Sequence, residues 1–309
     1  MNSGTLRNAL RATALLVLIV IGASAFIRLS AAGLDCADWP ACYAHWSTPT
    51  AGDASSAPKV DKMPVTVARG IHRVAATAVG ILLLGLVLVG WDKFAGSAAK
   101  GAALAAIVLT AFLAWLGRYT PSELPVVVLG NLLGGMLLFA LLWWLAGGDP
   151  GSSRKPGAPV LNAALALLLC QMGLGGMLSA RRGLLSCATF PSCNGKWWPA
   201  GFDGRLFDPL VRNADVAADG AALVMAHRLG ALLIALIVGG VALRARRAGG
   251  RSATVANGLL MLLGTQLLLG ASLVLIDRPL PLAVLHNSGA ALLLATLVSL
   301  LWPKGRTGS

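Results

Sequence analysis

The sequence predicts an all-α membrane protein with eight transmembrane helices, arranged as two four-helix bundles related by a pseudo-twofold axis. Of its 309 residues, 57% are hydrophobic and only 12% are charged, whereas a soluble domain carries about a quarter charged residues. Apolar runs of about 20 residues, long enough to cross a bilayer, recur along the whole chain. A repeated pattern of cysteines and histidines predicts the division into two halves.

The apolar runs predict the helices in chain order. They lack the alternation of polar and apolar residues that strands of a membrane barrel would show. Glycines within them, such as Gly134, Gly175 and Gly239, favour close helix–helix packing in lipid. The predicted helices cover about residues 9–29, 65–91, 101–118, 125–146, 159–180, 219–243, 253–275 and 281–302.

Two cysteine motifs mark the repeat. Cys36-Ala-Asp-Trp-Pro-Ala-Cys42 and Cys187-Ala-Thr-Phe-Pro-Ser-Cys193 share the pattern Cys-Ala-x-aromatic-Pro-small-Cys. Each motif lies between the first and second predicted helix of its half. The sequence therefore predicts an N-terminal half, 1–146, and a C-terminal half, 159–309, joined by a Gly-, Pro- and Ser-rich linker, 147–158. Four helices per half make this a parallel repeat.

The charge distribution predicts the orientation in the membrane, because cytoplasmic segments are enriched in Lys and Arg. With the N-terminus in the cytoplasm, the cytoplasmic segments hold 12 cations and two acids, and the opposite side holds 8 cations and 10 acids. Both termini are then cytoplasmic, and both cysteine loops lie outside. The net charge of +13 is accordingly a topology signal, and nucleic acid is not expected as a partner.

Each cysteine pair is expected to form a disulfide, Cys36–Cys42 and Cys187–Cys193, because outer loops face an oxidising compartment. The alternative is unpaired loop thiols. Zinc binding by either pair is disfavoured, because no further Cys or His lies at zinc-ligand spacing. Cys170, inside the fifth predicted helix, is expected to be a small packing residue.

Matched histidines follow the cysteine motifs. His227 lies about eight residues into the sixth helix, and His286, 59 residues later, about five into the eighth. Both would sit roughly 8–12 Å below the outer surface at 1.5 Å rise per residue. Two imidazoles at one depth on parallel helices can bind a heme from both faces as axial ligands. The alternative is a pair of buried, hydrogen-bonded histidines.

The N-terminal half repeats this pattern incompletely. His72 corresponds to His227, but the position 59 residues after His72 is Asn131. Asn is a poor iron ligand, so a heme here would be held by His72 alone. The alternative is that this half binds no heme and His72 only packs. Arg69 lies three residues before His72 and shares its helix face.

Arginines follow both repeated histidines directly. Arg228 could pair with heme propionates near the outer surface. The alternative is that its side chain extends to lipid phosphate.

These motifs together resemble the heme A synthase family of bacterial and mitochondrial inner membranes. The resemblance covers nearly the whole chain. Its strongest segments are Gly33-Leu-Asp-Cys-Ala-Asp-Trp-Pro-Ala-Cys42, Cys187-Ala-Thr-Phe-Pro-Ser-Cys-Asn-Gly-Lys-Trp-Trp-Pro199 and Ala226-His-Arg-Leu-Gly-Ala231. It implies an oxidoreductase that converts the C8 methyl of heme O to a formyl group, giving heme A for cytochrome oxidase assembly.

The resemblance also implies site residues. A heme b cofactor (iron protoporphyrin IX) would be held by His227 and His286. The substrate heme, heme O becoming heme A, would lie in the N-terminal half, where the family has two histidines and a glutamate one turn before the first. Here only His72 matches, and Asn131 and Arg69 stand at the other two positions. A guanidinium does not replace a carboxylate that orients a proton or a water.

Further implications concern location and partners. The resemblance places the chain in the bacterial inner (plasma) membrane as a multi-pass protein in contact with lipid, with heme O synthase and an electron donor as partners. A homo-oligomer is compatible with the sequence. Two other functions remain open. One is a non-enzymatic heme b-binding assembly or electron-transfer protein, and the other is a small-solute transporter, suggested by the repeat alone.

Overall fold

The computed structural model describes residues 1–31, 62–94, 96–120, 124–147, 158–198, 203–213 and 220–302. Within these residues, eight helices are long and apolar enough to cross a membrane. The predicted fold class, an all-α protein with eight transmembrane helices, is thereby confirmed. The helices are α1 (Ser3–Leu29), α3 (Lys62–Gly90), α4 (Gly96–Leu116), α5 (Pro125–Ala146), α6 (Ala158–Ala180), α7 (Ala221–Arg247), α8 (Gly250–Leu275) and α9 (Leu280–Val298).

Capping and turn residues, rather than hydropathy alone, set where these helices begin and end. α1 begins six residues before its apolar run, because the Asn2 side chain accepts a hydrogen bond from the Thr5 amide at 2.7 Å. α5 matches its predicted range, since Pro125 starts it at a position that proline favours. α7 continues to Arg247, beyond the predicted end at 243, and its last turn carries arginines that complement the helix dipole.

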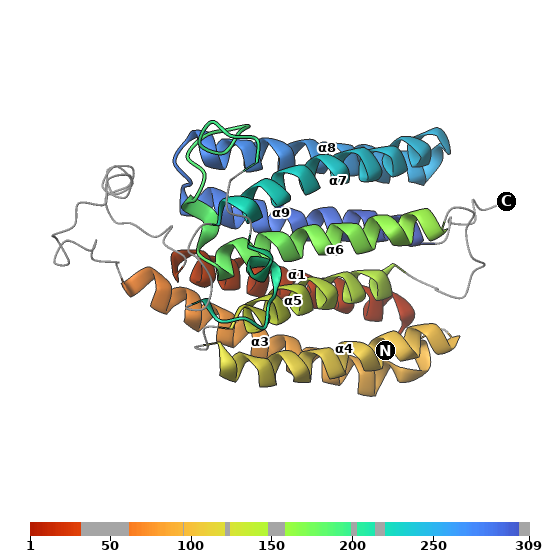
Figure 1. The fold of residues 1–309 in the computed structure, drawn as a ribbon. Coiled ribbons are helices and arrows are strands. Elements are labelled where there is room, and N and C mark those ends of the chain that lie inside the picture. Colours follow the sequence, from red (N-terminus) through yellow and green to blue (C-terminus); the bar gives the residue numbers. More distant parts are fainter. Residues whose placement is uncertain are drawn as a thin grey trace.

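Four helices form the middle of the bundle, as Figure 1 shows. α1 packs against α5 and α9, and α5 also packs against α6 and α9. α3 and α4 lie at one edge of this group, and α7 and α8 lie at the other (Figure 1). The two predicted halves therefore meet through the first and last helix of each.

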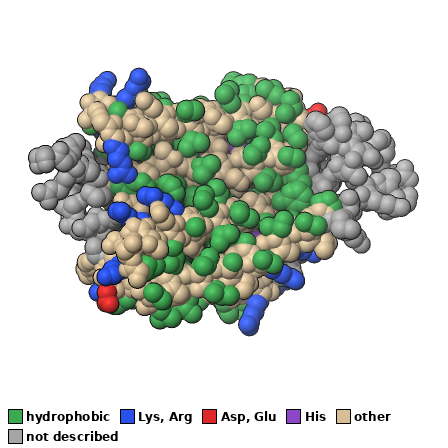
Figure 2. Space-filling view, turned by 180° about the vertical axis from the view of Figure 1, so that it is seen from behind, with side chains coloured by type: hydrophobic (Ala, Val, Ile, Leu, Met, Phe, Trp, Pro, Cys, Tyr) green, Lys and Arg blue, Asp and Glu red, His purple; other side chains and the backbone are tan. Residues whose placement is uncertain are grey.

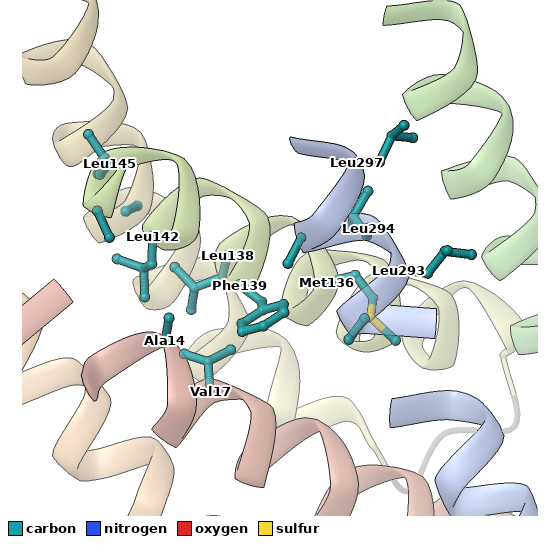
Figure 3. Close-up of a cluster of buried hydrophobic side chains, with 14 of the residues drawn as sticks. Ala14, Val17, Met136, Leu138, Phe139, Leu142, Leu145, Leu293, Leu294 and Leu297 are labelled. Carbon is teal, nitrogen blue, oxygen red and sulfur yellow. The ribbon is translucent and has the colours of Figure 1, made fainter. Parts of the chain in front are cut away.

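The buried core extends through all eight helices and includes the contact among α1, α5 and α9. Figure 3 shows side chains of α1, α5 and α9 gathered around Phe139, which is 1% exposed. Removing such a large buried side chain costs about 3–5 kcal/mol. The neighbouring core residues labelled in the figure are Ala14, Val17, Met136, Leu138, Leu142, Leu145, Leu293, Leu294 and Leu297.

The outer surface of the helices is apolar, as a lipid-facing surface requires. Figure 2 shows hydrophobic side chains spread over the middle of the molecule, while most Lys and Arg side chains gather at one end. That end is where α1 begins and α7 ends, opposite the segments 183–198 and 203–213 in Figure 1.

A compact segment covers the opposite end of α6 and α7. It contains the short 3-10 helices η4 (Gly183–Leu185) and η5 (Gly204–Phe207). Arg181, which is 9% exposed, holds it by donating to the carbonyl oxygens of Arg205, Leu206, Asp208 and Val211 and to Asn213 Oδ1. One buried guanidinium thus binds four carbonyl oxygens of this segment, of which those of Arg205 and Asp208 also accept from backbone amides.

Candidate functional site

The structure brings His227 and His286 together. His227 lies on α7 and His286 on α9, and α8 packs against both helices. The centroids of the two imidazole rings are 6.5 Å apart, and their planes are inclined by 75°. Both rings are enclosed by helices, yet each keeps part of its surface accessible. The two side chains predicted as axial ligands therefore face each other across a short gap.

This separation fits one iron between the rings. An imidazole nitrogen lies about 2 Å from a bound metal ion, as in zinc–histidine sites. Two such bonds, together with the half-widths of both rings, add up to roughly the observed 6.5 Å. Within the described residues, no cluster of three or more His, Cys, Asp or Glu side chains is present. Two nitrogen ligands suit a heme, which supplies the other four itself, better than a zinc ion.

Unpartnered polar atoms point to the same ligand. His286 Nδ1 and Arg228 Nη2 are buried, and neither has a hydrogen-bond partner. A buried polar atom without a partner costs about 1–3 kcal/mol. A bound heme would give Arg228 a propionate to pair with, so the unpartnered Nη2 fits a site built for that group.

Glycines make room beside both rings. A Cβ placed on Gly175 of α6 would lie 3.2 Å from His227 Cε1, and one on Gly270 of α8 would lie 3.3 Å from His286 Cε1. Glutamines lie on the same two helices. Gln171 Nε2 is 3.1 Å from His227 Nδ1 and donates to the His227 carbonyl oxygen at 2.8 Å.

A disulfide loop lies against Arg228, the residue that follows His227. Cys187 and Cys193 form the disulfide that the sequence predicts, with a Cα–Cα distance of 4.7 Å. Arg228 Nη1 donates to the carbonyl oxygens of Pro191 and Ser192 at 3.0 and 2.9 Å. Its guanidinium also lies 5.4 Å from the centroid of the Phe190 ring.

A second arginine holds the start of the same loop. Arg278 donates to the carbonyl oxygens of Leu184 and Cys187. The loop is therefore fixed from α7 by Arg228 and from the α8–α9 connection by Arg278. The other predicted disulfide, Cys36–Cys42, lies outside the described residues.

The N-terminal half does not bring its predicted residues together in this way. His72 is half-buried on α3, whereas Arg69 is exposed. Asn131 Nδ2 donates to the carbonyl oxygen of Val127 in its own helix, α5, at 2.9 Å. Among the described residues, no hydrogen bond or ring contact joins His72 to Asn131. Among the described residues of this half, His72 is thus left as the one candidate ligand.

Sequence reasoning missed Arg28, near the outer end of α1. Its guanidinium donates to Ser179 Oγ of α6 and, at 2.9 Å, to Asn287 Oδ1 of α9. Arg28 therefore ties the first half to the residue that follows His286. A cation within an apolar run is unusual, and that feature could have identified it.

The expectation for Cys170 was wrong. Its side chain is exposed on α6 rather than packed in the core. The position of Cys170 in an apolar helix does not reveal which face of that helix meets other helices.

Comparison with known proteins relates this arrangement to one group. Residues 7–298 match the COX15-CtaA family model, described as cytochrome oxidase assembly protein. The heme A synthase of Shewanella oneidensis is 33% identical, over 97% of this chain and 98% of that protein. The heme A synthases of Rhizorhabdus wittichii and Methylobacterium radiotolerans are each 26% identical, over 74% and 96% of this chain and 68% and 89% of their own lengths.

Proposed function

The chain belongs to the COX15-CtaA family of cytochrome oxidase assembly proteins, and from that premise we propose that it is a membrane heme A synthase with heme b in its C-terminal half. It is an oxidoreductase that converts the C8 methyl of heme O to the formyl group of heme A. The observation that carries the heme b site is the facing pair His227 and His286, with ring centroids 6.5 Å apart.

In the C-terminal half, His227 and His286 would hold heme b between their rings. Heme b would supply electron transfer at this site. Arg228 Nη2, buried without a partner, takes a propionate in a charge-assisted hydrogen bond. The loop 187–193, held by Arg228 and Arg278, limits access of water to the histidine pair.

In the N-terminal half, His72 is the ligand of the substrate heme. Asn131 is a poor iron ligand and its amide nitrogen is engaged with its own helix. Arg69, which is exposed, stands where the resemblance implies a glutamate. The substrate is therefore held through one histidine, which leaves its second axial position free.

The orientation follows from the charges. We place the protein in the bacterial inner membrane, with the termini and the Lys- and Arg-rich end in the cytoplasm. The disulfide loop is then periplasmic or extracellular. Heme O synthase supplies the substrate, and an electron donor or acceptor exchanges electrons with the heme b site.

Heme extraction from the purified protein, with chromatographic identification and heme counted per chain, tests this function. Heme O or heme A beside heme b is the expected result. Expression in a bacterial strain that lacks its own synthase should also produce heme A. Absence of heme A in that strain, with the protein present in the membrane, would contradict the synthase activity.

A second candidate function is a non-enzymatic heme b protein that acts in oxidase assembly or electron transfer. The exposed Arg69 and the self-bonded Asn131 favour it, because both stand where the family has catalytic-site residues. This candidate predicts heme b alone, at one per chain, and no effect of Arg69→Ala.

A further inference from the structure

Each histidine of the C-terminal half faces a glutamine on the preceding helix. Gln171 of α6 contacts His227 of α7 at both the ring and the backbone carbonyl. Gln266 of α8, which is 8% exposed, reaches α9 one turn beyond His286, where a Cβ on Gly289 would collide with its Nε2. A buried amide in a membrane helix needs a polar partner. Gln171 has its partner at His227, and the unsatisfied His286 Nδ1 is the candidate partner for Gln266.

Glycines make this contact possible in both pairs, in the same register. The glycine three residues after each histidine leaves room for the glutamine: a Cβ on Gly230 would collide with Gln171 Oε1, and one on Gly289 with Gln266 Nε2. The glycine four residues after each glutamine, Gly175 or Gly270, leaves room for the imidazole. In both pairs, a helix with the pattern Gln-x-x-x-Gly thus packs against a following helix with the pattern His-x-x-Gly. The pairs are α6 with α7 and α8 with α9.

The polar atoms of the second pair are unsatisfied. Gln266 Nε2 and His286 Nδ1 are both buried without a hydrogen-bond partner. In the first pair, Gln171 Nε2 already lies 3.1 Å from His227 Nδ1. An amide carries a donor and an acceptor on one planar group. A half-turn of the terminal amide, which in the first pair gives up the bond to the His227 carbonyl oxygen, presents its oxygen to the ring nitrogen instead.

We propose that Gln171 and Gln266 are positioning residues, whose side-chain amides hold the ring nitrogens of His227 and His286 that do not bind iron. This inference rests on the proposed heme b site. A metal-bound imidazole carries its proton on the free nitrogen and donates it to a neighbouring acceptor, which fixes the ring and raises its basicity. Oε1 of each glutamine is that acceptor when heme is bound.

The N-terminal half has no glutamine at the positions that correspond to Gln171 and Gln266. The cysteine motifs are 151 residues apart, and the position 151 residues before Gln171 is Val20. The His-Arg pairs are 155 residues apart, and the position 155 residues before Gln266 is Ala111. Glutamine partners thus accompany the histidines of the resident cofactor and are absent where the substrate heme must enter and leave.

Substitution of the glutamines tests the proposal on the intact protein in detergent. The variants are Gln171→Leu and Gln266→Leu, which remove the amide, and Gln171→Glu, which offers only acceptor oxygens. Thr265→Val is the matched control, because Thr265 lies beside Gln266 on α8 but donates to the Met261 carbonyl of its own helix. The measurements are the heme b reduction potential, its low-spin spectrum, and the rate of heme transfer to a heme-free globin.

The two kinds of variant should shift the potential in opposite directions. The leucine variants should raise it, because a ligand without an acceptor is less basic, and should release heme about tenfold faster or more. Gln171→Glu should lower the potential, since a carboxylate withdraws the ring proton more strongly. A folding defect alone would not produce opposite shifts. If a leucine variant does not accumulate, the direction in which Gln171→Glu shifts the potential still tests the proposal.

Suppose that the wild-type protein holds a heme with two histidine ligands but the substituted proteins show unchanged potentials and release rates. That result would overturn this inference and leave the proposed heme b site standing. Wild-type protein without such a heme would overturn the proposed heme b site as well.

Discussion

Histidines that look alike in the sequence lie in different surroundings within the apolar helices. His227 and His286 face each other and contact the glutamine-bearing helices. His72, which shares the His-Arg motif, has no matching partner among the described residues. The same local motif therefore serves two different environments, set by the helices packed around it.

His227→Ala and His286→Ala should each abolish the low-spin heme b spectrum, because each removes one of two axial ligands. His72→Ala is the matched control and should leave that spectrum intact, since His72 lies in the other half. Absorption spectra of the reduced and oxidised purified proteins provide the measurement. Loss of heme b in His72→Ala, with normal protein yield, would contradict the assignment of ligands to halves.

At the level of elements, two side chains hold parts of the chain together. Arg181 binds the segment 203–213, and Trp302 binds the end of α5. Trp302 Nε1 donates to the Trp144 carbonyl oxygen at 3.2 Å, and its ring stacks near Trp143 at 5.7 Å. Gly147, directly after α5, is packed against the same indole. The end of the last helix is thus fastened to the end of α5, from the other half.

Arg181→Ala should release the segment 203–213, because four of its carbonyl oxygens lose the guanidinium that binds them together and those of Leu206 and Val211 lose their donor. We expect at least about 2 kcal/mol of local destabilisation. Limited proteolysis from the outer side should cut this segment faster. Arg205→Ala is the control, since its side chain forms an exposed ion pair with Asp203, and such pairs contribute at most about 1 kcal/mol. Equal cleavage rates in both variants would count against this role for Arg181.

Gly147→Ala should lower the thermal unfolding temperature in detergent, because the added Cβ would overlap the Trp302 indole. Overpacking of this kind costs about 1–3 kcal/mol. Gly85→Ala in α3, where a Cβ meets nothing within 4 Å, is the control. It should be neutral or slightly stabilising, since alanine favours a helix. An unfolding temperature that is unchanged in Gly147→Ala would show that Trp302 can move aside freely.

The elements also show what sequence could predict. Hydropathy located all eight helices, because lipid demands an unbroken apolar run, and the spacing of Cys187 and Cys193 predicted their disulfide. Helix ends such as Ser3 were misplaced because a capping contact, not hydropathy, decides them. Gln171 and Arg28 were missed because their partners lie on other helices, and the exposed side of Cys170 depends on packing that no local pattern encodes.

At the level of the whole molecule, polar groups lie at the two ends of the helix bundle rather than on its sides. The Lys- and Arg-rich end of Figure 2 lies opposite the segments 183–198 and 203–213, and the sides between them are apolar. Such a molecule has one favourable orientation in a membrane whose cytoplasmic side retains positive charge. The histidine pair then lies nearer the outer side.

Introduced cysteines should report this orientation in a Cys170→Ala background. A membrane-impermeant thiol reagent should label Trp197→Cys in intact cells, because residue 197 is 70% exposed in the outer segment. Arg246→Cys, at the exposed cytoplasmic end of α7, should react only after the membrane is opened. The reverse pattern of labelling would invert the proposed topology.

The contact of Arg28 with Ser179 and Asn287 has a consequence for biosynthesis. α1 leaves the ribosome before α6 and α9, the helices to which its partner residues belong. Until those helices are inserted, the guanidinium of α1 has no partner from them and must remain near water or lipid headgroups. α1 can therefore take its final depth only after α6 and α9 are in the membrane, so the placement of an early helix depends on the synthesis of two later ones.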